Sequence, residues 1–117
     1  MSQLDQIRKK QLLEAPETIT TDWVSPSCSL DNRVGAFSLS FKYINGSAVN
    51  MKVYVQLSND DLEYGELEES EAVITEDTGT VLFDMEGSGA AYIRISIVVT
   101  SGSIDAVELR FNASQFH

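Results

Sequence analysis

Tyr92-Ile93-Arg94-Ile95-Ser96-Ile97-Val98-Val99 alternates apolar and polar residues over most of its length. Side chains of a β-strand point to opposite faces of a sheet with a period of two, so this alternation predicts a strand with one buried and one solvated face. The same pattern recurs at residues 37–43, 51–57 and 107–111. The sequence therefore predicts an all-β protein.

Turn signals separate these segments and predict where each strand ends. Asn45-Gly46 is typical of a tight hairpin turn and predicts a hairpin between residues 36–44 and 50–57. Evenly spaced short strands favour an antiparallel β-sandwich or jelly-roll of seven to eight strands. The predicted core comprises Phe37, Leu39, Phe41, Met51, Val53, Val55, Leu57, Val81, Phe83, Ile93, Ile95, Ile97, Val99, Val107, Leu109 and Phe111.

The N-terminal segment differs from the rest of the chain. Apolar residues near helical spacing, followed by Pro16, predict a short helix over residues 2–15. An isolated helix of this length is marginal in water, so it docks on its own domain, docks on a partner, or stays partly disordered. We therefore expect an N-terminal helical arm at residues 1–17 and a β-sandwich domain at residues 18–117.

Composition narrows the classes of partner. The 117 residues suit one domain, and the formal net charge is −10, with no Lys or Arg between Lys52 and Arg94. An acidic domain repels phosphate backbones, so no nucleic acid partner is expected. No apolar stretch approaches the roughly 20 residues that span a bilayer, and the N-terminus lacks a secretory signal, so we expect no membrane partner and synthesis in the cytoplasm. The single Cys28 agrees with a reducing compartment.

Residues for catalysis are scarce. The only His is His117, the last residue, so Cys28 has no plausible base and is expected to be a buried thiol. Zinc ligands and a glycine-rich phosphate loop before a helix are lacking as well. We expect no catalytic residues, no cofactor and no enzymatic activity.

The acidic segment raises the question of calcium, which binds clustered oxygen ligands. A twelve-residue calcium loop starting at Asp60 would need carboxylates where Leu62 and Tyr64 stand, so that match is coincidental. A looser site built from Asp60, Asp61 and Glu63 stays open. The alternative is a solvated loop whose charges repel one another.

Tyrosines provide a second candidate site. Exposed Tyr54 or Tyr64 could stack on a sugar ring, as aromatic rings do in carbohydrate-binding proteins. Packing in the core, a hairpin or an interface is the simpler explanation for both.

Four motifs together resemble the small β-sandwich virion proteins of tailed bacteriophages and related prokaryotic viruses, the minor capsid, head decoration and fibre-base class. They are Ser29-Leu30-Asp31-Asn32, Val55-Gln56-Leu57-Ser58-Asn59-Asp60, Tyr92-Ile93-Arg94 and Thr100-Ser101-Gly102-Ser103. The resemblance covers most of residues 29–113. The chain departs from the usual form at Asp61, where Gly is expected, and in the acidic insertion that follows.

The resemblance implies a non-enzymatic structural subunit of a virion, made in the host cytoplasm and present in many copies. Its partners would be a viral capsid or other virion proteins and further copies of itself as a homo-oligomer. The arm would attach it to the shell through Leu4, Ile7, Arg8, Lys9, Lys10, Leu12 and Leu13. The alternative function is a carbohydrate-binding or adhesion β-sandwich module, with or without dependence on calcium.

Overall fold

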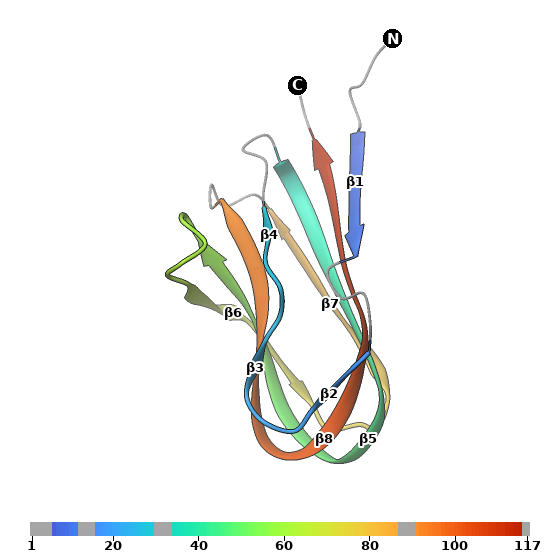
Figure 1. Ribbon diagram of the computed structural model, residues 1–117. Coiled ribbons are helices and arrows are strands. Elements are labelled where there is room, and N and C mark those ends of the chain that lie inside the picture. The colour runs from blue at the N-terminus through green and yellow to red at the C-terminus, as the bar shows by residue number, and fades with distance from the viewer. Residues whose placement is uncertain (1–5, 12–15, 30–33, 87–90, 116–117) are drawn as a thin grey trace.

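The computed structural model describes residues 6–11, 16–29, 34–86 and 91–115 (Figure 1). Every regular element in these ranges is a β-strand, and every strand pairing is antiparallel. The all-β class is confirmed, whereas the choice between sandwich and jelly-roll stays a prediction. The strands are β1 (Gln6–Gln11), β2 (Glu17–Ile19), β3 (Trp23–Val24), β4 (Cys28–Ser29), β5 (Val34–Ser58), β6 (Gly65–Ile74), β7 (Gly79–Glu86) and β8 (Tyr92–Gln115).

Two long strands form the centre of the sheet. β5 and β8 pair with each other from Val34 opposite Gln115 to Ser58 opposite Tyr92. The second edge of β8 is lined by β1, β2, β3 and β4, and the second edge of β5 is lined by β7 and β6. The flanking strands are short, whereas β5 and β8 have 25 and 24 residues.

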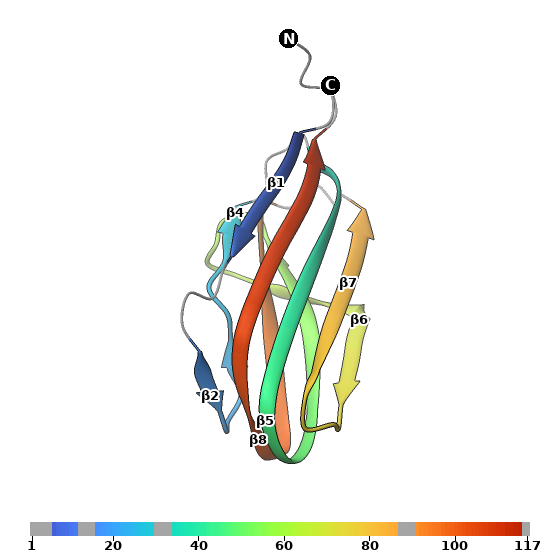
Figure 2. The same cartoon turned by 90° about the vertical axis from the view of Figure 1, so that its right-hand side faces the viewer.

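Both central strands bend halfway, so that the sheet folds over and its two halves face each other (Figures 1 and 2). We call residues 34–44 of β5, 105–115 of β8, β1 and β7 the first half-sheet. The second half-sheet contains residues 50–58 of β5, 92–99 of β8, β3, β4 and β6. At the bend the pairing shifts register between Ile44 and Asn50, where Asn45 and Ala48 have positive φ angles of 56° and 51°.

The hairpin predicted at Asn45-Gly46 is therefore wrong. Asn45 does adopt the left-handed conformation that a turn signal indicates, but it lies at a bend of one strand instead of in a turn that joins two. The same holds for Ser101-Gly102-Ser103, which lies within β8. Gly102 has a φ of 86°, and a Cβ there would stand 2.4 Å from the carbonyl oxygens of Ser47 and Ala48. Glycine is required at this close approach of the two strands.

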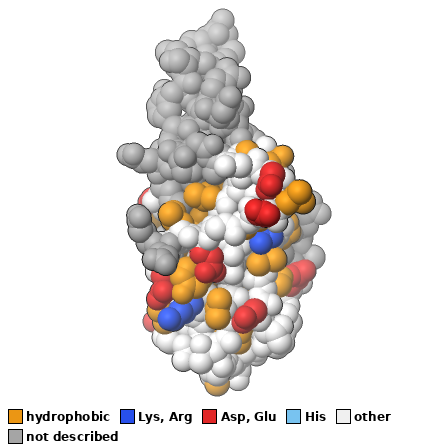
Figure 3. Space-filling model, turned by 90° about the vertical axis from the view of Figure 1, so that its left-hand side faces the viewer, with side chains coloured by type: hydrophobic (Ala, Val, Ile, Leu, Met, Phe, Trp, Pro, Cys, Tyr) orange, Lys and Arg blue, Asp and Glu red, His pale blue; other side chains and the backbone are white. Residues whose placement is uncertain are grey.

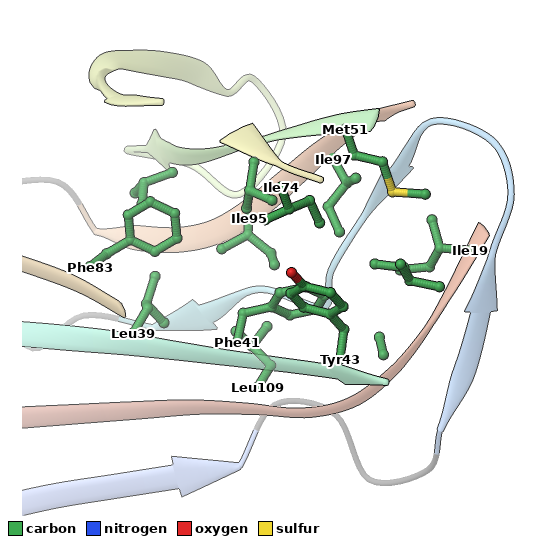
Figure 4. Packing of buried hydrophobic residues seen from close by; sticks show 14 of the residues in the cluster. Ile19, Leu39, Phe41, Tyr43, Met51, Ile74, Phe83, Ile95, Ile97 and Leu109 are labelled. Carbon is green, nitrogen blue, oxygen red and sulfur yellow. The ribbon is translucent and has the colours of Figure 1, made fainter. Parts of the chain in front are cut away.

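The core lies between the two half-sheets (Figure 4). Most of the predicted core residues are buried, and Leu57, Val81 and Val99 pack against them while partly exposed. The side chain of Phe37 lies outside the described residues. The sequence analysis missed six buried apolar residues: Ile19, Tyr43, Val49, Ile74, Ile104 and Ala106.

The prediction that Val107 is buried is wrong, because β8 carries a bulge there. Lys42 pairs with Glu108 and Tyr43 with Ala106, so Val107 is the extra residue. A bulge shifts the inward face by one residue, and Ala106 and Leu109 are buried on either side of it.

The helix predicted over residues 2–15 is also corrected. Residues 6–11 form β1, which pairs with β8 from Gln6 opposite Gln115 to Gln11 opposite Arg110. A helix of this length with a narrow apolar stripe is marginal on its own, whereas the edge of β8 pairs the backbone of these residues within the sheet. The remaining residues of the predicted helix lie outside the described ranges, and the domain boundary at residue 17 stays a prediction.

Candidate functional site

The outer face of the second half-sheet gathers several of the residues that the sequence analysis singled out. Lys52 pairs with Val98, Tyr54 with Ser96, and Gln56 with Arg94. These residues alternate along their strands with fully buried ones, so they point away from the core. The period-two alternation of the sequence predicts the same outer positions for Lys52, Tyr54 and Arg94.

Tyr64 and Arg94 form one cluster at the end of this face. The guanidinium carbon of Arg94 lies 3.8 Å from the centre of the Tyr64 ring, a cation–π contact. Arg94 Nε donates a hydrogen bond of 2.7 Å to Gln56 Oε1. One face of the Tyr64 ring is thus occupied, so a ligand could stack only on the opposite face.

Asp61 fixes the other end of Tyr64. The Tyr64 hydroxyl donates a hydrogen bond to Asp61 Oδ1. This bond, followed by one from the Ser27 side chain, lowers the pKa of Asp61. Burial, followed by the bond to Asp61, raises the pKa of Tyr64. Tyr64 is therefore protonated and Asp61 ionised at neutral pH, which maintains this hydrogen bond within the loop.

Asp60 has a local structural role in the same loop. Its Oδ1 accepts hydrogen bonds from the backbone N–H groups of Leu62 and Glu63, at 2.9 and 3.0 Å, and from the Ser58 hydroxyl, at 3.0 Å. The bonds from the backbone of Glu63 and then Leu62 are the main reasons why the pKa of Asp60 is lowered. The carboxylate thus closes a turn of its own loop.

The described residues hold no group of three or more His, Cys, Asp and Glu side chains that could bind a metal ion. Asp60, Asp61 and Glu63 are neighbours in the loop, but Asp60 and Asp61 direct their carboxylates to loop partners. The calcium site stays a prediction. Binding of calcium would have to compete with the hydrogen bonds that close the loop.

Tyr54 lies in the middle of the outer face. Its hydroxyl donates a hydrogen bond of 2.8 Å to Glu71 Oε2, and Lys52 Nζ lies 3.8 Å from Glu71 Oε1. Three of the large apolar residues that are exposed, Val24, Val73 and Val98, share this face, because their register partners are Ser96, Lys52 and Lys52. Figure 3 shows this side of the molecule, where acidic, basic and apolar side chains are mixed. A surface with such a mixture of side chains is suited to binding a partner.

The residues predicted for attachment to a shell do not form one helical stripe. Ile7, Arg8, Lys9 and Lys10 belong to β1, where successive positions belong to opposite faces of the sheet. Leu4, Leu12 and Leu13 lie outside the described residues. The structure brings the basic residues to an edge of the first half-sheet, which the sequence analysis did not anticipate.

The two residues considered for nucleophilic chemistry are not brought together. Cys28 is buried, as expected, and His117 lies outside the described ranges. Within the part of the chain that the structure describes, no helix has the length and apolar character needed to cross a bilayer.

The sequence analysis missed the contact between Tyr64 and Arg94, and it overestimated the length of the acidic loop. The solvated loop considered for the acidic segment is shorter, because β6 begins at Gly65. Neither residue of the contact carries a local signal, because they are 30 positions apart and meet through the pairing of β5 with β8. Only knowledge of the register could have revealed it.

The fold is shared with proteins of several origins. No protein-family model matches this chain, and no curated protein matches it in sequence. Solved structures similar to it include one derived from a prophage, one from a virus and one CBM4, a carbohydrate-binding module. At 7 to 16% identity, these likenesses establish the fold alone.

The SPBc2 prophage-derived protein YomS is similar over 98% of both chains, with a TM-score of 0.63 and 10% identity. The infectious bursal disease virus VP2 subviral particle matches 98% of this chain and 33% of its own, with a TM-score of 0.64 and 7% identity. The CBM4 structure matches 93% of this chain and 77% of its own, with a TM-score of 0.60 and 16% identity.

Proposed function

We propose that this protein is a non-enzymatic structural subunit of a virion, of the capsid decoration, minor capsid or cement type. It attaches to a viral shell and associates with further copies of itself. Its scaffold is the folded sheet, arranged as a β-sandwich or jelly-roll. The observation that carries the proposal is the end-to-end likeness to the prophage-derived YomS, together with the likeness to the VP2 subviral particle. The resemblance of four sequence motifs to phage virion proteins supports the same proposal independently of the structure.

The structure supplies features that suit this role. A rigid core between two half-sheets gives a stable scaffold, and the outer face of the second half-sheet mixes apolar and charged side chains as contact surfaces do. On this face, contacts between Tyr64 and Arg94 and between Tyr54 and Glu71 hold the side chains in place. Such preorganisation reduces the entropy that is lost on binding.

The test is whether the protein occurs in virus particles. We expect mass spectrometry of purified particles to detect it in many copies, and labelling in electron micrographs to place it on the shell. A protein that is expressed during infection but is absent from particles would contradict the proposal. A matched control is the same particle preparation from a virus whose gene for this chain is deleted.

The second candidate function is binding of carbohydrate. It is favoured by the likeness to CBM4 and by the position of Tyr54 and Tyr64 on one outer face. Glycan-array binding that is lost in Tyr54→Ala or Tyr64→Ala would establish it. Tyr54→Phe and Tyr64→Phe are the matched controls, because they keep the ring for stacking and remove only the hydroxyl.

A further inference from the structure

Each side of the first half-sheet ends in a strand whose outer backbone edge pairs with no other strand in the described ranges. Among the described strands, β1 pairs only with β8, and β7 pairs only with β5. Figure 2 shows β1, β8, β5 and β7 side by side, with β1 and β7 outermost. A free edge presents a row of unpaired N–H and C=O groups, which can accept a strand of another chain.

These two edges carry opposite charge. β1 contains Arg8, Lys9 and Lys10 and no acidic residue. β7 and the turn before it contain no Lys or Arg and four acidic residues: Glu76, Asp77, Asp84 and Glu86. Like charges oppose the pairing of β1 with β1 or of β7 with β7 in two copies, whereas β1 and β7 attract each other.

The strand directions also suit this pairing. β1 is antiparallel to β8, β8 to β5, and β5 to β7, so β1 and β7 run in opposite directions. Two copies that stand side by side in the same orientation bring β1 of one next to β7 of the other as an antiparallel pair. Antiparallel is the pairing used throughout this fold and the more common one in proteins generally.

One exposed apolar side chain lies on β7 at the level of β1. Leu82 is 61% exposed. Leu82 is opposite Ser40, Ser40 is opposite Arg110, and Arg110 is opposite Gln11, the last residue of β1. Copies that stand side by side therefore bring β1 next to the second half of β7. An exposed Leu beside a free edge is a site where a second chain would bury apolar surface.

We propose that copies of this protein associate edge to edge, with β1 of one copy pairing antiparallel beside β7 of the next. The contact joins two different surfaces, so it repeats around a ring or along an open array. It explains how a chain with a net charge of −10 associates with itself, because the attraction between the two edges offsets the general repulsion. The inference rests on the self-association in the proposed function and names the surfaces that carry it.

The size of the edges predicts a weak single contact. β1 has six residues and β7 has eight, so one edge pairing buries little area compared with a stable dimer interface. Closure of a ring or fixation on a shell would strengthen it through the effective concentration of neighbouring copies. Self-association in solution should therefore depend strongly on protein concentration and on salt.

Sedimentation velocity of the full chain and three variants tests the proposal. The first variant, R8E/K9E/K10E, reverses the charge of β1, and the second, D84K/E86K, reverses that of β7. We expect the wild type to form species larger than a monomer as its concentration rises. Each variant alone should bind itself at least roughly tenfold more weakly, as expected when close charge pairs become repulsive. An equimolar mixture of the two variants should restore assembly, because each then presents an edge that the other complements.

The matched control is K42E/R110E, which changes the net charge by as many units as the β7 variant, in the opposite direction, at exposed positions on the central strands. It should assemble like the wild type. Circular dichroism establishes that each variant is folded, and if the β1 variant fails to fold, the β7 variant alone decides. The proposal is overturned if the wild type stays monomeric, if the face variant dissociates as readily as the edge variants, or if the mixture does not assemble. None of these results affects detection of the chain in virus particles, so the failure of each proposal can be distinguished.

Discussion

The central strands β5 and β8 and the flanking strands β1–β4, which we call the flanking run, differ in what makes them strands. β5 and β8 alternate between buried and exposed residues over long stretches, so their local pattern reveals both their type and their inward face. β1–β4 are short and weakly patterned, and they become strands because they lie against the free edge of β8. Local sequence thus determines the centre of the sheet, whereas pairing determines its margin.

The largest effect is expected where a central strand loses a core side chain. Phe111 is fully buried on β8 and packs between the two half-sheets. Phe111→Ala should lower the free energy of unfolding by about 3–5 kcal/mol, from lost burial and the cavity left behind. Urea denaturation measures this loss. Leu82→Ala is the control, because Leu82 is largely exposed and its removal should change stability little. Equal effects of the two would contradict the assignment of the core.

The second effect is expected at the bend of the central pair. Gly102→Ala forces a side chain into a positive φ and against the carbonyl oxygens of Ser47 and Ala48. We expect a loss of about 2–4 kcal/mol from backbone strain and overpacking. Gly65→Ala is the matched control, because no atom lies within 4 Å of a Cβ at that position. If denaturation shows Gly102→Ala to be as stable as Gly65→Ala, the bend does not depend on this close approach.

Features that depend on local alternation could be predicted from the sequence, whereas features that depend on the alignment of two strands could not. Alternation identified the inward rows of β5 and β8, including Leu39, Val53 and Ile95, because period two is a local property. It could not reveal that Asn45 bends a strand instead of ending it, since both structures use the same left-handed conformation. It also placed Val107 in the core, because a bulge becomes visible only when two strands are aligned.

The candidate site was predictable in part. The outer positions of Tyr54 and Arg94 followed from the same alternation. The position of Arg8, Lys9 and Lys10 on a strand was not predictable, because three consecutive basic residues do not distinguish a helix from a strand. Their pairing with the edge of β8 determines the strand. The opposite charges of β1 and β7 are evident in the sequence, but their meaning depends on the topology that places them at opposite sides of one half-sheet.

A third and smaller effect is expected in the flanking run, at Ser25. The hydroxyl oxygen of this buried residue accepts a hydrogen bond of 2.9 Å from the backbone N–H of Ile95. Ser25→Ala leaves that buried donor without this acceptor, which should cost about 1–3 kcal/mol. Ser25→Thr keeps the hydroxyl and serves as the control. We expect the Ile95 amide to exchange its hydrogen faster in Ser25→Ala than in the wild type. Exchange that is no faster would contradict the role of the side chain.

The smallest effect concerns Asp105, which ties β2 to the bend of the central pair. Its carboxylate accepts hydrogen bonds from Asn45 Nδ2, at 2.9 Å, and from Thr18 Oγ1, at 2.8 Å. The bond from Asn45, followed by that from Thr18, lowers the pKa of Asp105 below its ordinary value of 3.8. A carboxyl group whose pKa is lower in the folded protein stabilises the fold above its unfolded pKa, and this contribution is lost as the pH falls through the folded pKa.

Asp105→Asn should therefore lower the Tm near neutral pH, and the difference from the wild type should disappear on acidification. Asp60 and Asp61 also have lowered pKa values, but both are present in the two proteins, so their titration cancels in the difference. Thermal melting of both proteins from about pH 2 to pH 7 measures it. A difference that persists at the lowest pH would mean that Asp105 acts through the shape of its side chain and not through its charge. Backbone pairing with β8 and the burial of Ile19 would then hold β2 to the bend without a contribution from this charge.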